Sequence, residues 1–351
     1  MHLIREERNL IIQGDALAEL KKLPSGSIDC CVTSPPYYRM RDYGATGQIG
    51  LEDSVQEYIE KLLTVFNEVK RVLKPDGTLW INIADCYAGS GKGKGQTTPL
   101  AKVQSSNKGI LGVHKFDLVK PSNIGMKPKD LMGVPWLLAF ALRADGWYWR
   151  ETNIWEKPNC MPESVKDRCT LSHEYMLMFS KSARYYYDYE AIQEPCIGNN
   201  NIPPAGSKGT FRPNSRRRCE NRKSFRGGGT YTKNMSFDNK TSKVNETHGN
   251  APNVSGLRRK RSVWRVASVK SPYNHFATYP PKLIEPCILA GSREGGIVID
   301  PFAGTGTTGE VARNHNRDFI LIDISKENID ICHQRLDREQ VSVFGISKNK
   351  N

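Results

Sequence analysis

The chain has 351 residues, of which 38% are hydrophobic and 25% charged, and its formal net charge is +14. This composition is that of a globular protein, and the length suits one large domain or two ordinary ones. The longest apolar run, at 131–142, is far short of the roughly 20 residues of a membrane helix. Nine cysteines without a CxxC pair predict neither a disulfide framework nor a zinc site. No signal peptide is recognisable, so a cytoplasmic protein is expected.

The first part of the sequence alternates short apolar segments with amphipathic ones. Turn signals separate them, such as Lys74-Pro75-Asp76-Gly77. Apolar residues at helical spacing predict helices, and short buried runs predict strands. The expected elements are a strand at 9–12, a helix at 16–23, a strand at 28–32, a helix within 51–72 and a strand at 78–83.

The central part is less regular. Residues 88–125 are rich in glycine, serine and lysine and are predicted to form a loop. A helix is expected at 129–144, followed by strands at 147–155 and 175–180. The stretch 190–262 is polar and poor in aliphatic residues, which is typical of a disordered segment or of a module that orders on its ligand.

The C-terminal part regains the alternation of the first. A helix is predicted at 281–289, a strand at 296–300, a glycine loop with a helix to residue 314, and a strand at 318–323. Strands that alternate with helices predict an α/β fold with a mostly parallel sheet.

Basic residues are concentrated in two internal segments. Residues 201–265 contain 16 Lys and Arg against three acidic residues, and residues 88–125 contain six lysines against one aspartate. The larger segment also contains aromatic residues, a mixture that suits contact with the phosphates and bases of nucleic acid. The residues expected to contact DNA are Arg216, Arg217, Arg218, Arg222, Lys223, Arg226, Arg258, Arg259, Lys260 and Arg261.

A strand, a glycine loop and a helix start follow one another at 297–309. Glycines allow a ligand to approach the backbone, and a helix N-terminus offers unpaired N–H groups. Asp323 ends the next predicted strand, where a carboxylate can accept hydrogen bonds from ribose hydroxyls. The spacing Gly304, Gly306, Gly309 also fits a dinucleotide site, but Asp300 would repel a pyrophosphate, and the GK[ST] of a P-loop is missing. An adenosyl ligand without phosphates fits better than NAD or ATP.

The segment Ser34-Pro35-Pro36-Tyr37 follows a predicted buried strand, at the sheet edge where open α/β folds bind ligands. Two prolines stiffen it and leave carbonyl acceptors. The oxygens of Ser34 and Pro35 can accept hydrogen bonds from an amino group, and the Tyr37 ring offers a face for stacking a base. Taken alone, the segment is also explained as a rigid turn.

Together these residues resemble the amino-methylating DNA methyltransferases, which transfer a methyl group from S-adenosyl-L-methionine to an exocyclic nitrogen of cytosine or adenine. The family's catalytic tetrad, (Asp/Ser/Asn)-Pro-Pro-(Tyr/Phe), is matched by Ser34 to Tyr37, and its cofactor loop resembles 300–308. Because the tetrad precedes the loop, the order resembles the circularly permuted β group. The resemblance covers about 9–190 and 262–340.

The resemblance implies a Rossmann-like methyltransferase fold in three regions. Residues 1–189 and 266–345 would be the two parts of the catalytic domain, and residues 190–265 an inserted target-recognition region. The catalytic part at the N-terminus would carry the tetrad, and the C-terminal part the cofactor loop.

Further residues carry over from the resemblance. Asp15 matches the acid that contacts the cofactor's adenine, and Asp323 the acid that binds its ribose. Trp155 matches an aromatic residue that, with Tyr37, helps hold the flipped base, and 275–281 resembles the segment at the cofactor's methionine end. The residues expected to bind the cofactor are Asp15, Phe276, Tyr279, Pro280, Asp300, Pro301, Phe302, Gly304, Gly306, Thr307, Thr308 and Asp323.

The implied reaction is site-specific methylation of cytosine N4 in double-stranded DNA, with the base flipped out of the duplex. Proximity and electrostatics would supply the rate, without a metal or a covalent intermediate. A serine at position 34 favours cytosine, and the segment 41–50 resembles cytosine-N4 members that act on GC-rich palindromes. A restriction endonuclease that acts on the same site is a candidate partner.

Three alternatives remain beside this reading. Methylation of adenine N6 is the nearest, and a catalytically inactive DNA-binding protein with the same fold is another. A cytosine-C5 enzyme would need a cysteine nucleophile, but neither Cys196 nor Cys287 follows a predicted strand at the sheet edge.

Overall fold

A computed structural model gives the structure of the chain. The residues that it describes are 8–39, 47–88, 126, 127, 129–195, 257–269 and 279–344, with side chains up to residue 336. The chain divides into two compact units, of which the larger comprises Met1–Ile192 and Lys260–Asn351 and the smaller Gln193–Arg259.

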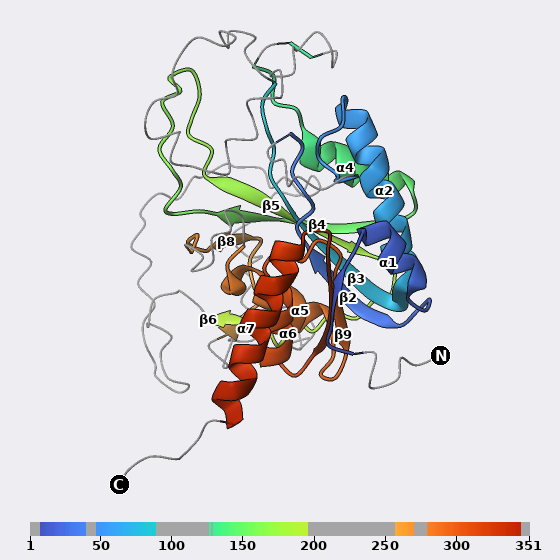
Figure 1. Cartoon of the computed structure of the whole chain (residues 1–351). Helices are drawn as coiled ribbons and strands as arrows, with labels where there is room; N and C mark the ends of the chain where they lie inside the picture. The colour runs from blue at the N-terminus through green and yellow to red at the C-terminus, as the bar shows by residue number, and fades with distance from the viewer. Residues whose placement is uncertain are drawn as a thin grey trace, which may run out of the picture. The chain divides into compact units, whose positions relative to one another are not determined.

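Eight strands of the described residues form a sheet in the larger unit, in the order β1-β10-β9-β2-β3-β5-β4-β8 (Figure 1). The first five run parallel, β5 is antiparallel to both its neighbours, and β8 is parallel to β4. The mostly parallel α/β sheet expected from the sequence is therefore confirmed. The strands are β1 (Leu10–Gln13), β2 (Ile28–Thr33), β3 (Leu73–Ile83), β4 (Tyr148–Glu156), β5 (His173–Ser180), β8 (Val263–Arg265), β9 (Ile297–Asp300) and β10 (Asp318–Asp323).

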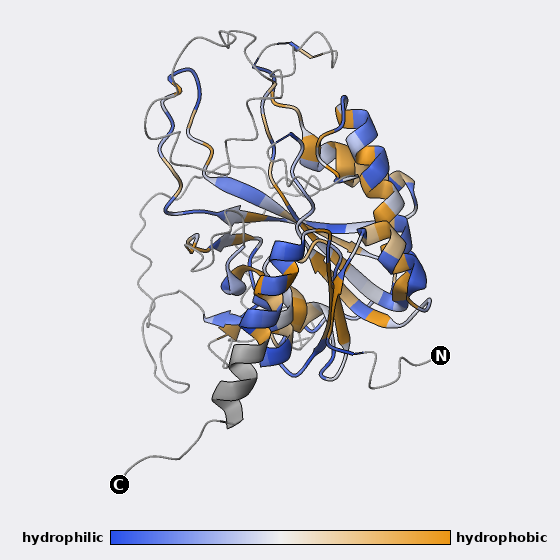
Figure 2. Ribbon diagram, in the orientation of Figure 1, coloured by the Kyte–Doolittle hydropathy of each residue, from blue (hydrophilic) through white to orange (hydrophobic). Residues whose placement is uncertain are grey.

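Helices cover both faces of this sheet (Figure 1). Successive strand residues point to opposite faces, so Cys31 and Ile299 pack under α1, α2 and α4, whereas Cys30 and Val298 pack under α5, α6 and α7. Figure 2 shows the matching hydropathy, with apolar strands at the centre and polar outer helix faces. The helices are α1 (Ala16–Lys22), α2 (Val55–Val72), α4 (Val134–Ala144), α5 (Pro281–Gly291), α6 (Thr307–Asn314) and α7 (Lys326–Phe344).

Several element boundaries differ from the sequence prediction for local reasons. Helix α2 begins at Val55 because the Ser54 hydroxyl accepts a hydrogen bond from the Glu57 N–H and caps it. Helix α4 begins at Val134 rather than 129, because Gly133 adopts a left-handed conformation. Residues 74–77, predicted as a turn, instead belong to β3 and form an irregularity in its pairing with β2. Helix α7 was not predicted.

The smaller unit is described only at its two ends. There β6 (Glu194–Pro195) pairs antiparallel with β7 (Leu257–Arg258), and the Arg258 Nε lies 3.0 Å from the Glu194 Oε1. The six arginines and lysines predicted to contact DNA at 216–226 lie outside the described residues, as does the loop expected at 88–125 apart from Ala88. The described part of the chain contains no helix that could span a membrane. Nor does it contain a cluster of acidic, His and Cys side chains suited to a metal ion.

Candidate active site

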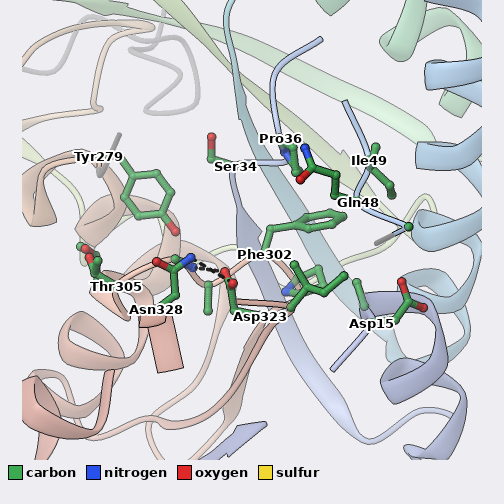
Figure 3. Close-up of a pocket in the computed structure, with 17 residues that line it drawn as sticks. Asp15, Ser34, Pro36, Gln48, Ile49, Tyr279, Phe302, Thr305, Asp323 and Asn328 are labelled. Carbon is green, nitrogen blue, oxygen red and sulfur yellow. Dashed lines mark hydrogen bonds between the residues drawn. The ribbon is translucent and has the colours of Figure 1, made fainter. Parts of the chain in front are cut away.

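Strands β9 and β2 lie side by side at the centre of the sheet, and their connections leave in opposite directions. The chain passes from β9 through α6 to β10 on one side, and from β2 through α2 to β3 on the other. Such a switch point leaves a crevice beyond the carboxyl ends of the two strands. A pocket lies there (Figure 3), lined by Asp15, Ala16, Ser34, Pro36, Gly47, Gln48, Ile49, Tyr279, Pro301, Phe302, Ala303, Gly304, Thr305, Thr307, Asp323, Ile324 and Asn328.

Asp300 ends β9 and is fully buried. Its Oδ1 accepts hydrogen bonds from the Thr33 hydroxyl at 2.6 Å and the Phe302 N–H at 3.1 Å. Its Oδ2 accepts from the Tyr279 hydroxyl at 2.8 Å and the Thr308 hydroxyl at 2.6 Å. Burial raises the pKa of this carboxyl in spite of its four donors. Asp300 therefore ties the loop to β2 and α6, and it does not line the pocket.

Asp323 ends β10 and does face the pocket (Figure 3). Its Oδ2 accepts from the Gly304 N–H at 2.8 Å, while its Oδ1 accepts from the Ser325 N–H at 2.8 Å and the Asn328 Nδ2 at 3.0 Å. Burial raises the pKa of Asp323 as well. The carboxylate is thus held from three sides, with its remaining acceptor capacity toward the pocket.

The glycine loop serves two purposes. Gly304 lines the pocket, whereas Gly306 does not and instead is the N-cap residue of α6, with a φ of 80°. A Cβ at Gly306 would lie 3.0 Å from the Cys332 Sγ, so the glycine allows close packing against α7. Thr305, between the two glycines, is fully buried, and its Oγ1 has no hydrogen-bond partner among the described residues.

The side of the pocket that faces away from the glycine loop is formed by the start of α1 and by residues 47–49. Asp15 caps α1, with its Oδ1 accepting from the Ala18 N–H at 2.9 Å, and borders the pocket. The Phe302 ring projects toward Pro36 and Gln48 (Figure 3). The pocket therefore combines an aromatic face with carboxylates at two of its edges.

The tetrad closes this pocket at the end of β2. Ser34 and Pro36 line it, and the Pro36 carbonyl accepts a hydrogen bond of 2.8 Å from the hydroxyl of Tyr58, a buried residue of α2. The Ser34 Oγ lies 3.5 Å from the Tyr37 hydroxyl. Helix α2 thus fixes the path of the tetrad through one of its prolines.

Two further strands hold the tyrosine of the tetrad. The Tyr37 hydroxyl lies 2.8 Å from the Glu174 Oε2 of β5 and 3.2 Å from the Asn82 Oδ1 of β3. The Asn82 Nδ2 also donates to the Glu174 Oε2 at 3.1 Å, and Lys157 forms an ion pair with the Glu174 Oε1. Burial, and secondly the Glu174 charge, raise the pKa of Tyr37 well above its ordinary value.

Trp155 lies in the core, away from the pocket surface. Its side chain is part of a buried cluster and only 4% of the residue is exposed. The indole N–H donates to the Val266 carbonyl at 2.8 Å, and the Lys157 Nζ lies 4.2 Å from the ring centroid. Trp155 is not among the residues that line the pocket, and its role in holding the flipped base stays a prediction.

The other predicted residues are placed as follows. Tyr279, Pro301 and Thr307 line the pocket, whereas Pro280 and Thr308 are buried without lining it. Phe276 lies outside the described residues. Of the basic residues, Lys260 has its Nζ 5.3 Å from the Trp264 ring centroid, and Arg258 is paired with Glu194. Arg259 and Arg261 also have interaction partners.

The residues of this site that were not predicted include Thr305, Asn328, Tyr58, Asn82 and Glu174. Thr305 carried a signal, because it lies inside the glycine loop that was identified. Asn328 follows Asp323 by five residues at the start of an unpredicted helix. The other three come from α2, β3 and β5 and carried no local signal.

Comparisons with known proteins agree with this geometry. A family model described as DNA methylase, of the N6/N4 type, matches residues 28–334, which include both the tetrad and the glycine loop. The chain is 40% identical over 343 residues to the type II methyltransferase M.Cfr9I of Citrobacter freundii, covering 96% of this chain and 90% of the relative. It is 39% identical over 330 residues to M.SmaI of Serratia marcescens, covering 94% and 91%.

Solved structures show the same fold. The PvuII DNA methyltransferase (cytosine-N4-specific) matches with a TM-score of 0.54 at 18% identity, covering 97% of this chain and 86% of that one. A DNA modification methylase of Thermus thermophilus, complexed with S-adenosyl-L-methionine, matches with a TM-score of 0.51 at 19% identity, covering 93% and 92%. By the family match and the 40% identity along nearly the whole chain, this protein belongs to the N6/N4 family of DNA methylases.

Proposed function

We propose that this DNA methylase transfers a methyl group from S-adenosyl-L-methionine to N4 of a cytosine that has been flipped out of a specific double-stranded sequence. One observation carries the proposal. Ser34 and Pro36 of the tetrad line the same pocket as Phe302 and Asp323 of the cofactor half. An amino acceptor site and an adenosyl-type site thus share one cavity.

The pocket's donor set fits this cofactor. Asp323 retains acceptor capacity for a ribose hydroxyl, since its Oδ2 accepts one bond from the described residues. The Phe302 ring suits the adenine face, and Asp15 suits its amino group. The Thr305 hydroxyl is buried without a hydrogen-bond partner among the described residues, and it can bond the polar methionine end. When bound, the cofactor supplies a methyl group on a positively charged sulfonium.

The tetrad would act on the amino group of the base. That nitrogen is a weak nucleophile because its lone pair is delocalised into the ring. Hydrogen bonds from its protons to the Ser34 Oγ and the Pro35 carbonyl would favour a tetrahedral nitrogen aimed at the methyl group. The Pro36 carbonyl already accepts a hydrogen bond from the Tyr58 hydroxyl, and we assign the second amino proton to the Pro35 carbonyl.

We propose different roles for two of the predicted site residues. We assign Asp300 to positioning the loop, because its four donors come from the protein itself. The charge of Asp300 is therefore not needed for a ligand contact. Trp155 is assigned to supporting β4 and β8, through its bond to Val266.

Finer features belong to the same proposal. The tetrad strand β2 precedes the cofactor-loop strand β9 in sequence but lies beside it in the sheet, which supports a circularly permuted motif order. The basic region 190–265 is proposed to read the target sequence. A restriction endonuclease with the same site is the proposed partner, since the relatives named above are type II methyltransferases.

Transfer of tritiated methyl groups from S-adenosyl-L-methionine to mixed-sequence duplex DNA tests the reaction, and mass spectrometry of the nucleosides identifies the product. N4-methylcytosine is expected. N6-methyladenine would move the substrate to adenine, and no transfer by folded protein would refute the proposal.

A further inference from the structure

Glu174 is a nearly enclosed carboxylate in the tetrad half of the site that the reaction described above leaves without a task. Its side chain is 13% exposed, and it is the second residue of the antiparallel strand β5, beside the end of β3. An isolated charge in such a place is costly, and the ion pair with Lys157 offsets that cost. Among the described residues, it is the carboxylate that hydrogen-bonds a tetrad side chain.

The chemistry of the groups fixes the direction of the hydrogen bonds. The Tyr37 hydroxyl has one proton and two acceptors in reach, the Glu174 Oε2 at 2.8 Å and the Asn82 Oδ1 at 3.2 Å. The carboxylate oxygen is the nearer of the two and the charged one, so the proton is assigned to Glu174. The Tyr37 oxygen can then only accept, and the hydroxyl that reaches it is that of Ser34, at 3.5 Å. This last bond is long, as catalytic hydrogen bonds often are before substrate binds.

The same chain of hydrogen bonds determines whether the Ser34 hydroxyl donates or accepts toward the pocket. With its proton directed to Tyr37, the Ser34 Oγ presents lone pairs toward the pocket that it lines. A serine in this state can accept a hydrogen bond from an amino group but does not donate one to it. Asn82 reinforces the arrangement, because its Nδ2 donates to the same Glu174 oxygen.

We propose that Glu174 is a positioning residue that makes Ser34 an acceptor and receives the proton released in the reaction. This rests on the proposed function. As the nitrogen–methyl bond forms, the carbon–sulfur bond breaks and its electron pair stays on sulfur. The methylated nitrogen then loses one proton to the Ser34 Oγ, the Ser34 proton passes to Tyr37, and the Tyr37 proton passes to Glu174.

Other buried carboxylates of the larger unit lack such a chain. Asp85 accepts from the backbone N–H groups of Cys86, Gly133 and Val134 and so caps α4. Asp300 accepts from three side-chain hydroxyls and a backbone N–H. Neither contacts a tetrad side chain in the described bonds, so the inference applies to Glu174.

The test is a double-mutant cycle on the full-length protein with Glu174→Gln, Tyr37→Phe and the double variant. Single-turnover methyl transfer is measured on a duplex that the wild type is first shown to methylate, together with the Kd for S-adenosyl-L-methionine and for DNA. Glu285→Gln serves as the control, because it removes one carboxylate that pairs with His315 between α5 and α6.

Each single variant should lower the methyl-transfer rate roughly tenfold or more, as expected for a lost proton-transfer partner, with both Kd values unchanged. The double variant should be no slower than the slower single one, because the two residues act through one chain. Glu285→Gln should retain the wild-type rate. Additive effects, a loss confined to Kd, or an unchanged rate in Glu174→Gln would overturn the inference. Failure of the wild type itself to methylate DNA would instead refute the proposed function.

Discussion

The cofactor half of the site, at the ends of β9 and β10, is held together differently from the tetrad half at the end of β2. In the cofactor half, Asp300 and Asp323 are fixed by donors from the glycine loop and from neighbouring helices and strands. In the tetrad half, Tyr37, Asn82 and Glu174 come from three segments and hold one another. The cofactor half is therefore formed before any ligand binds, and we call it the cradle. The tetrad half contains a chain of hydrogen bonds to which a bound base can add its own.

The largest expected effect tests the cradle. Asp300→Ala removes the acceptor that four donors share in a fully buried place, and the free energy of unfolding should fall by roughly 4 kcal/mol. Urea unfolding followed by circular dichroism measures it. A loss below about 1 kcal/mol would mean that the donors find other partners and that the cradle is not held through this carboxylate.

A change in the tetrad should impair methyl transfer and leave cofactor binding intact. Ser34→Ala removes the proposed acceptor for the amino group and should lower single-turnover methyl transfer roughly 100-fold. The Kd for S-adenosyl-L-methionine, measured by calorimetry, should stay unchanged. A collapse of cofactor affinity would place Ser34 in the cofactor half instead.

A substitution in the cofactor half should instead impair cofactor binding. Asp323→Ala should weaken cofactor binding about 10- to 100-fold, since hydrogen bonds to a charged group contribute about 1.5–3 kcal/mol. Asp318→Ala is the matched control, because it removes an aspartate from the other end of β10, where it pairs with Arg8. Equal affinities in the two variants would count against the ribose assignment.

Lowering the pH should weaken cofactor binding through Asp323. The ionised carboxylate is the form that accepts from ribose hydroxyls, and burial raises the pKa of Asp323. Cofactor affinity should therefore fall as the pH is lowered through this raised pKa, beginning above the range of an ordinary aspartate. Calorimetric Kd values across a pH series measure this fall, and Asp323→Asn should flatten it. A pH-independent Kd in the wild type would contradict this role.

The smallest effect concerns the base side. Trp155→Phe removes the indole bond to Val266 and should cost about 1 kcal/mol of unfolding free energy. Methyl transfer by the folded variant should remain near the wild-type rate. A large fall in that rate would restore the base-holding role that the family resemblance implies.

The cofactor half could be predicted from sequence because its residues are neighbours in the chain. Gly304 lies in the loop after one recognisable strand and Asp323 ends the next one, and the structure brings both to the pocket. What could not be predicted was which side of the loop each residue faces. Asp300 ends its strand as predicted, but the hydroxyls of Thr33, Tyr279 and Thr308 surround it and separate it from the pocket.

The tetrad half was predicted only as far as the tetrad itself. Tyr58 and Asn82 lie in correctly predicted elements, but nothing in a helix or strand pattern indicates which polar side chain reaches a loop of another element. Glu174 depends on the sheet order, since β5 lies between β3 and β4. That order is fixed by long-range pairing, which periodicity does not reveal.

The reversed direction of β5 has a practical consequence. A parallel strand of this sheet reaches the edge where the pocket lies only with its last residue. The residues that follow belong to a loop, whose backbone is not held by strand pairing. An antiparallel strand arrives there with its first residues, and Glu174 is already paired in register with Trp155 of β4. Its backbone is therefore fixed by strand pairing rather than by a loop. Position 174 is a place where the chemistry beside the tetrad can be exchanged by a single substitution without rebuilding the loop that carries Ser34.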